Sequence, residues 1–250
     1  MARSSFDASS GARKCGFGRT KCWGNDMCNL YSNTTAVEAM RQLFAVPVAK
    51  DRLGNAEPLS AIYPKYEAPV VRLDKDGDHE LINLSWGFRT TKKSKKTGNV
   101  IAPAAWNNAR SDKVATSGLW KYSFQHRRCL VPASSYCEWP PGGRPQNYHW
   151  FALKGDEPRP PFAFAGMWQM SKYETKEGPE TCETHTFLTT TGNELTRNVH
   201  PERMPVILNP KEYEAWLYGS TDHALELLRP YPAEKMQIVR KGVEEKADPG

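Results

Sequence analysis

The first candidate for chemistry is Cys28, which directly follows Met27. If translation or processing leaves Cys28 as the first residue, its α-amine and thiol form a 1,2-aminothiol. The unperturbed pKa is about 7.7–8.0 for the α-amine and about 8.5 for the thiol, so both are partly deprotonated near neutral pH. An aldehyde can form an imine with the amine, which the thiol closes to a thiazolidine. An internal cysteine cannot do this, and a buried apolar cysteine is the alternative interpretation.

Two further residues are candidates for proton transfer. Glu138 follows Cys137 in an aromatic-rich predicted strand, where it shares a face with Tyr136. Desolvation there would raise the pKa of its carboxyl and suit it to acid–base work, whereas an exposed edge-strand glutamate is the alternative. His200 lies in a predicted loop and could transfer protons near neutral pH, with a solvated histidine as the alternative.

Other side chains could bind a nucleic acid. Asn108 could fix a substrate through its amide, and Arg110 could hold a phosphate with a pair of hydrogen bonds. Trp106 and Trp139 could stack on bases. The alternatives are a turn-forming asparagine, a surface arginine and buried tryptophans.

Composition narrows the class of protein. Apolar residues make up 39% and charged residues 25% of the 250 residues, which is typical of a globular chain and not of a disordered one. No apolar run reaches the roughly 18 residues of a membrane span, and the amino terminus lacks the apolar region of a secretory signal. The net charge of +6 permits nucleic-acid binding without requiring it.

Cysteine spacing and short motifs exclude several kinds of site. The six cysteines contain no CxxC pair, so we expect reduced thiols in a cytoplasmic protein, without a metal or other cofactor. The absence of GxGxxG, P-loop, HExxH and GxSxG patterns removes several enzyme classes.

The chain divides into three parts. Residues 1–27 are rich in Ser, Gly and Arg and predict a disordered leader or an upstream translation-start artefact. Residues 28–243 show no internal repeat or linker and predict one catalytic domain. Residues 244–250 are charged and predict a mobile tail.

Periodicity and turn signals predict the elements that position these residues. We expect strands at 28–31, 69–73, 80–86, 136–139, 148–153, 162–168 and 184–190, with Asp76-Gly77 as a hairpin turn. Helices are predicted at 119–124, 210–216 and 224–228, and from a cap at Thr34 or Thr35 through Phe44. Residues 53–68 should be irregular, and 200–208 a loop entering a strand. The lysine-rich run 92–96 predicts a solvated loop, with a phosphate-contacting flap as the alternative.

Several separated motifs carry a family resemblance. They are Met27-Cys28 before a short strand, Asn108-Ala109-Arg110, Arg128 to Pro132 leading to Tyr136-Cys137-Glu138-Trp139, and Val199-His200 with Arg203 to Leu208. In this order, the chain from Cys28 onward resembles the SOS-response-associated peptidase family, also described as abasic-site-processing proteins.

The resemblance implies a single α+β domain with a barrel-like, mostly antiparallel β core and peripheral helices. It implies a monomer that binds abasic single-stranded DNA, associates with the nucleoid, and forms a covalent thiazolidine crosslink with lyase-type chemistry. Cys28 would then be the nucleophile, Asn108 would position the substrate or amino terminus, Glu138 would move protons, and His200 would assist sugar ring opening and reversal. The implied DNA-binding residues are Arg110, Trp106, Trp139 and Arg203.

The chain departs from the family pattern at several motifs. Asn29-Leu30 replaces the frequent Gly-Arg, Ser111-Asp112-Lys113 replaces x-Glu-Thr, Pro201-Glu202 lengthens the histidine motif, and the lysine-rich run replaces Pro-x-Trp. Two alternatives to the crosslinking protein stay open. One is a cysteine-type peptidase acting on itself or another protein, and the other is a non-catalytic single-stranded DNA-binding module in which Cys28 stays internal.

Overall fold

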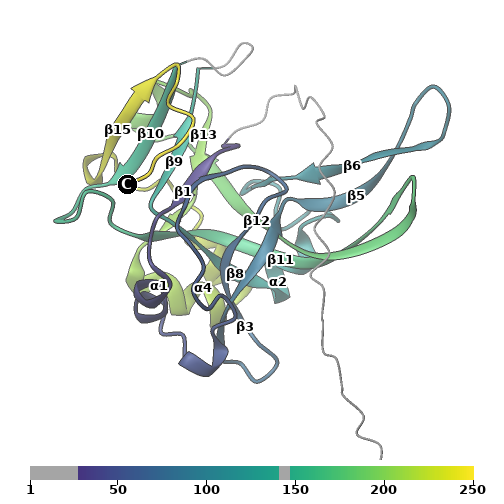
Figure 1. Ribbon diagram of the computed structural model, residues 1–250, viewed down its shortest axis with the longest axis horizontal. Helices are drawn as coiled ribbons and strands as arrows, with labels where there is room; N and C mark the ends of the chain where they lie inside the picture. Colours follow the sequence, from purple (N-terminus) through teal and green to yellow (C-terminus); the bar gives the residue numbers. More distant parts are fainter. Residues whose placement is uncertain (1–27, 141–146) are drawn as a thin grey trace, which may run out of the picture.

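The computed structural model describes residues 28–140 and 147–250 (Figure 1). The predicted leader, residues 1–27, lies outside the described residues. Within the two described ranges, no helix is long and apolar enough to cross a membrane.

Five strands close into a barrel. β12 (Gly178–Thr191) pairs with β4 (His79–Trp86) on one side and with β11 (Phe162–Thr175) on the other, and β3 (Glu67–Leu73) and β8 (Arg128–Ala133) complete the ring. Only the β12–β4 pair in this ring is parallel. The short strands β7 (Asn108–Arg110), β13 (Arg203–Pro205) and β14 (Ile207–Leu208) extend the same sheet. The predicted α+β domain with a barrel-like, mostly antiparallel core is therefore confirmed.

A second sheet carries the amino-terminal strand. Its five strands are antiparallel, in the order β15 (Met236–Gly242), β10 (Tyr148–Leu153), β9 (Ser135–Glu138), β1 (Tyr31–Asn33) and β2 (Leu59–Ile62). Figure 1 shows β15, β10, β9 and β1 side by side above the helices. Because β1 pairs with β9, the start of the described chain lies beside the strand that ends at Glu138.

The barrel strands bury both faces. Val71 and Leu130 pack in one apolar cluster with residues of the helices, whereas their neighbours Val70 and Val131 join an aromatic cluster that includes Tyr31. This alternation follows from the two-residue period of a strand. The helices are α1 (Val37–Leu43), α2 (Lys121–His126), α3 (Glu194–Arg197), α4 (Tyr213–Tyr218) and α5 (Thr221–Glu226), with short 3-10 turns at Val48–Lys50, Pro210–Glu212 and Ala233–Lys235.

The lysine-rich run lies at the end of a hairpin: Lys92 and Lys93 belong to a strand, against the predicted loop, whereas Lys95 and Lys96 lie in the exposed turn. β5 (Phe88–Lys93) and β6 (Val100–Trp106) make a separate two-stranded sheet that projects from the barrel (Figure 1). Two hydrogen bonds tie β5 to β11: the Arg89 N–H donates to Ser171 Oγ at 3.0 Å, and the Glu174 N–H to Thr91 Oγ1 at 2.9 Å. These tertiary contacts stabilise strands that lack an apolar period of their own.

Other local predictions also differ from the structure, and the predicted strand 28–31 is β1, which covers Tyr31–Asn33. Ala36, and neither Thr34 nor Thr35, occupies the N-cap of α1, and no side chain caps that helix. The region predicted as irregular contains β2. Strands β11 and β12 run well beyond the predicted ranges, because their outer halves pair with each other over residues with little alternation.

The tail after residue 243 contacts the second sheet. Asp248 is fully buried, and its carboxylate accepts hydrogen bonds from Arg159 Nε at 2.7 Å and Nη2 at 3.0 Å, and from Ser135 Oγ at 2.6 Å. The Asp248 carbonyl accepts from Ser32 Oγ at 2.8 Å. The tail is thus held to β1 and β9, the two strands that bring Cys28 and Glu138 together.

Candidate active site

The pairing of β1 with β9 places Cys28 beside Glu138. Tyr31 lies opposite Tyr136, and the Cys137 N–H donates to the Leu30 carbonyl at 2.9 Å, which extends the pairing toward Cys28. At its end the Cys28 N–H donates to Glu138 Oε1 at 3.1 Å. Since Glu138 is only 2% exposed, it is not the edge-strand surface residue considered as its alternative.

Burial keeps both reactive groups in their neutral forms near pH 7. It raises the pKa of the Glu138 carboxyl to about 8, although the hydrogen bond from the Cys28 N–H lowers it in part. The pKa of the Cys28 thiol lies well above its usual range because of burial and, secondarily, because of the nearby Glu138 and Cys137. A carboxyl with a pKa of about 8 can both donate and accept a proton near neutral pH.

Side-chain amides hold the backbone at Cys28. Asn108 Nδ2 donates to the Cys28 carbonyl at 3.0 Å, and Asn107 Nδ2 donates to Asn29 Oδ1 at 3.1 Å. Asn108 is positioned by β7, which pairs in parallel with β12. Cys28 itself has a φ of +24°, which is uncommon for a residue with a side chain. Of the four predicted catalytic residues, the structure joins Cys28, Asn108 and Glu138 directly.

His200 lies in the loop between α3 and β13. It is half-buried, its Nδ1 has no hydrogen-bond partner, and within the described residues no hydrogen bond joins it to Cys28 or Glu138. Burial lowers the pKa of its imidazole, which the carboxylate of Glu202 partly opposes. His200 is therefore mainly neutral near pH 7.

The two arginines predicted to bind DNA share one carboxylate. Asp112 accepts from Arg110 Nε at 3.1 Å and Nη2 at 2.8 Å, and from Arg203 Nη1 at 3.3 Å. Hydrogen bonds from Arg110 hold the pKa of Asp112 at about 2. Arg110 is exposed, whereas Arg203 is buried and also donates to Thr189. Asp112 occupies the position at which the family pattern has a glutamate.

The two predicted stacking residues differ in exposure. Trp106 is 47% exposed, and its indole N–H already donates to Thr90 Oγ1 at 3.0 Å. Trp139 is half-buried, with its ring edge-on to Tyr148 at 5.7 Å between centroids. The ring of Trp106 is thus the more accessible of the two.

Three buried polar side chains near Glu138 were not among the predicted catalytic residues. His149 lies directly opposite Glu138 in the β9–β10 register, on the same face of the sheet, and is buried with no partner for its Nδ1. The hydroxyls of Tyr31 and Tyr136 are likewise buried without a hydrogen-bond partner in the described chain. A correct prediction of the β9–β10 register would have placed His149 opposite Glu138. The pairing of β1 with β9, which brings Tyr31 to this site, has no signal in the local sequence.

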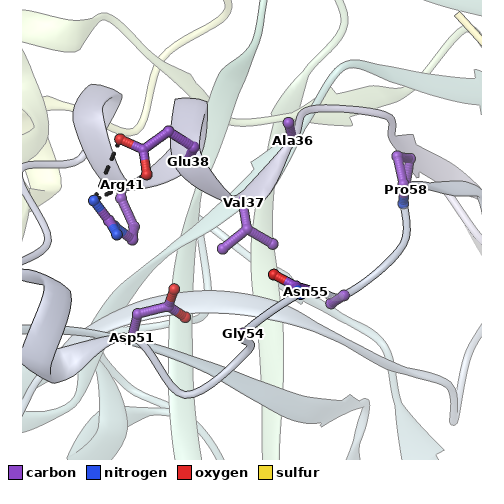
Figure 2. A pocket seen from close by; sticks show the side chains of 9 residues that line it. Ala36, Val37, Glu38, Arg41, Asp51, Gly54, Asn55 and Pro58 are labelled. Carbon is purple, nitrogen blue, oxygen red and sulfur yellow. Dashed lines mark hydrogen bonds and ion pairs between the residues drawn. The ribbon is translucent and has the colours of Figure 1, made fainter.

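A pocket of about 410 Å³ lies apart from these residues, between α1 and the following loop. Figure 2 shows the Arg41–Glu38 ion pair in its wall. In residues 28–140 and 147–250, no group of three or more His, Cys, Asp and Glu side chains could hold a metal ion. The candidate site is therefore the buried Cys28–Glu138 pair and its surroundings.

Comparison with known families supports the sequence resemblance. The family described as "SOS response associated peptidase (SRAP)" matches residues 27–245.

This chain belongs to the SOS response associated peptidase family.

Within the family, the chain is 31% identical to "Abasic site processing protein YoqW" of Bacillus subtilis (strain 168) over 193 residues, which covers 72% of this chain and 80% of that protein. It is 22% identical over 197 residues to "Abasic site processing protein YedK" of Escherichia coli (strain K12), covering 76% and 79% of the two chains. The resemblance stated from the motifs is therefore confirmed.

Solved structures share the fold of this chain. A protein from Bordetella bronchiseptica superposes with a TM-score of 0.65 at 22% identity, covering 87% of this chain and all of that one. A protein from Bacteroides thetaiotaomicron superposes with a TM-score of 0.61 at 22% identity, covering 84% and 90%. At this identity, the likeness concerns the fold alone.

Proposed function

We propose that this protein processes abasic sites in DNA as part of the DNA-damage response, by crosslinking the lesion to Cys28. The names of its relatives support the substrate class. The observation that carries the chemistry is the 3.1 Å contact between the Cys28 nitrogen and Glu138 Oε1 in a buried site. This contact places the Glu138 carboxyl, which can transfer a proton, next to the Cys28 nitrogen, which must attack the aldehyde.

The reaction starts once Cys28 is the first residue. Its α-amine adds to the C1 aldehyde of the open abasic sugar and gives a carbinolamine. The protonated Glu138 carboxyl donates a proton to the departing hydroxyl, so water leaves and a protonated imine forms beside the Glu138 carboxylate. Asn108 keeps the Cys28 carbonyl in place during these steps through its 3.0 Å hydrogen bond.

The thiol then completes the crosslink. Its sulfur bonds to the carbon of the protonated imine, which closes a thiazolidine, and its proton passes to the Glu138 carboxylate and restores the carboxyl. The overall change is the loss of one water. Because the ring replaces the imine, it prevents strand cleavage by β-elimination and shields the DNA.

The remaining predicted residues act on the sugar and the strand. Neutral His200 assists opening of the sugar ring and later reversal, since a neutral imidazole can accept one proton and donate another. Arg110 binds phosphate, and the buried Arg203 contacts the same Asp112 carboxylate as Arg110. The exposed ring of Trp106 stacks on a base of single-stranded DNA. Trp139 forms a secondary stacking surface.

A second candidate function is self-cleavage before Cys28. Two observations favour it: the φ of +24° at Cys28, a backbone strain typical of functional sites, and the contact of Glu138 with the peptide nitrogen that would leave. The Cys28 sulfur would add to the preceding carbonyl, and Glu138 would protonate the departing nitrogen. Water would then hydrolyse the thioester, which releases the leader and exposes the aminothiol.

One experiment separates these functions. Purified protein is incubated with an abasic single-stranded oligonucleotide, and the products are resolved on a denaturing gel and by intact mass. We expect a covalent band that Cys28→Ala abolishes and that the matched thiol variant Cys182→Ala retains. Native-gel binding without a covalent band would instead indicate a non-catalytic DNA-binding module. Cleavage of a peptide without DNA would indicate a peptidase acting on other proteins.

A further inference from the structure

The β5–β6 hairpin, residues 88–106, is a basic arm. Between Glu80 and Asp112 the sequence contains no acidic residue, and its basic residues are Arg89, Lys92, Lys93, Lys95, Lys96 and Arg110. The four lysines gather at the outer end of the hairpin, and all four are exposed. Within the part of the chain that the structure describes, none of these lysines forms an ion pair, so their charge is available to a partner.

The base of this arm is continuous with the candidate active site. β6 ends at Trp106, and the next two residues are Asn107 and Asn108, whose amides hold Asn29 and Cys28. At the start of β5, the buried Arg89 guanidinium donates to the Gly87 carbonyl at 3.1 Å and to Ser85 Oγ at 2.9 Å. Arg89 therefore anchors the arm to the barrel, and the exposed lysines are not needed for this.

One side of the arm packs on β11, where the Glu174 N–H bonds to Thr91 Oγ1. The neighbouring β11–β12 hairpin carries charges of both signs, Lys172 and Lys176 beside Glu174 and Glu177, whereas the charges at the outer end of the arm are all positive. From Trp106 to Val100 the strand spans about 20 Å at roughly 3.3 Å per residue, so the lysines lie far beyond the reacting atoms.

We propose that the lysines of this arm bind phosphates of the same DNA strand at a distance of about 20 Å from the lesion that Cys28 engages. The inference rests on the proposed function, because it needs DNA seated at Cys28. Charge complementarity identifies the partner: the exposed Lys92 and Lys93 at the end of β5, and Lys95 and Lys96 in the turn that follows, concentrate positive charge that attracts a phosphate backbone. The arm thereby adds affinity for long DNA without contacting the lesion.

The test compares two variants of equal charge. The arm variant carries Lys92→Gln, Lys93→Gln, Lys95→Gln and Lys96→Gln, and the control carries Lys75→Gln, Lys121→Gln, Lys211→Gln and Lys235→Gln at exposed positions outside the arm. Binding of abasic single-stranded oligonucleotides is measured against salt concentration. One oligonucleotide has about two nucleotides on either side of the lesion, too short to reach the lysines, and the other about fifteen.

On the long oligonucleotide, we expect the arm variant to flatten the plot of log affinity against log salt by about 0.7 for each phosphate that the lysines no longer bind, up to about 3 in total. The control should keep the wild-type slope, and the two variants should differ only on the long oligonucleotide. Equal slopes for both variants on the long oligonucleotide would contradict the proposal that the arm lysines bind phosphates. A covalent band in the same samples would show that the crosslinking function holds without that proposal. If the arm variant flattens the salt dependence but no covalent band forms at Cys28, phosphate binding by the arm lysines would be supported and the crosslinking function contradicted.

Discussion

The Glu138 carboxyl and the Cys28 nitrogen, 3.1 Å apart, are the two groups whose chemistry depends most on burial. Glu138 has a pKa of about 8 when the Cys28 nitrogen is an amide. A free α-ammonium at the same position would favour the carboxylate and lower that pKa. Removal of the leader therefore changes the protonation state of the site as well as its nucleophile.

The raised pKa of Glu138 predicts a pH-dependent stability for the unprocessed chain. The folded protein holds this proton between pH about 4.5 and about 8, whereas the unfolded chain releases it, so the free energy of unfolding falls as pH rises through that window. We expect a loss of about 3–5 kcal/mol that is complete above pH about 8, since one pKa unit corresponds to about 1.4 kcal/mol.

Urea unfolding at a series of pH values measures this effect on protein whose intact mass shows the leader. Glu138→Gln retains an acceptor for the Cys28 N–H but cannot titrate, so its profile should be flatter across the window. Substitution of the exposed Glu157 by Gln is the matched control and should keep the wild-type slope. Identical profiles for wild type and Glu138→Gln would show that the carboxyl is not desolvated.

Asp112 restrains the arginine that is best exposed to DNA. Asp112→Ala removes both hydrogen bonds from Arg110, while Arg203 keeps its bonds to Thr189. We expect tighter binding of single-stranded DNA and a salt dependence steeper by about 0.7, the effect of one additional phosphate contact. Fluorescence anisotropy against salt measures both quantities. Asp156→Ala makes the same charge change in an exposed loop, and an equal effect from it would show that only net charge matters.

At the scale of elements, the decisive contact is the β1–β9 pair. These strands come from opposite ends of the first half of the domain, and the carboxyl-terminal segment holds them through Asp248. The Asp248 carboxylate is fully buried and binds both Arg159 and Ser135. Removing one partner of a buried ion pair lowers the free energy of unfolding, because the charge of the remaining partner stays buried without compensation.

Loss of this clamp should destabilise the domain. We expect Asp248→Ala to reduce the free energy of unfolding by about 3 kcal/mol, within the range for breaking a buried ion pair. Chemical denaturation measures it, and a double-mutant cycle with Arg159→Ala should give a coupling of at least about 1 kcal/mol. Glu244→Ala removes the exposed pair with Lys246 and should cost less than about 1 kcal/mol. Equal effects from the two variants would contradict a structural role for Asp248.

At the scale of the whole molecule, local patterns predicted the elements better than their assembly. The hairpin of β3 and β4 is confirmed because its turn residues and strand residues agree, and β10 has the predicted bounds. The family motifs also identified the residues that meet at Cys28. The β1–β9 pairing joins residues about a hundred positions apart, and no local pattern encodes it.

The failures have physical causes. Apolar and polar residues alternate poorly in the strands of the arm, which are stabilised by hydrogen bonds to β11. The sequence therefore predicted a loop where Lys92 and Lys93 belong to β5. Strand β15 was missed because apolar and polar residues do not alternate along 236–242, which lie largely half-buried at one edge of the second sheet. His149 had no recognisable partner until the β9–β10 register placed it opposite Glu138.

The most direct test of the central claim is the intact mass of the adduct formed with an abasic oligonucleotide by two forms of the protein. One form begins at Cys28, and the other retains the preceding residues through a substitution of Met27 by Pro that blocks their removal. We expect only the first form to gain the mass of the oligonucleotide minus one water, on a Cys28 peptide that resists borohydride reduction. Equal crosslinking by the form that keeps its leader would contradict the account, because its Cys28 nitrogen is an amide.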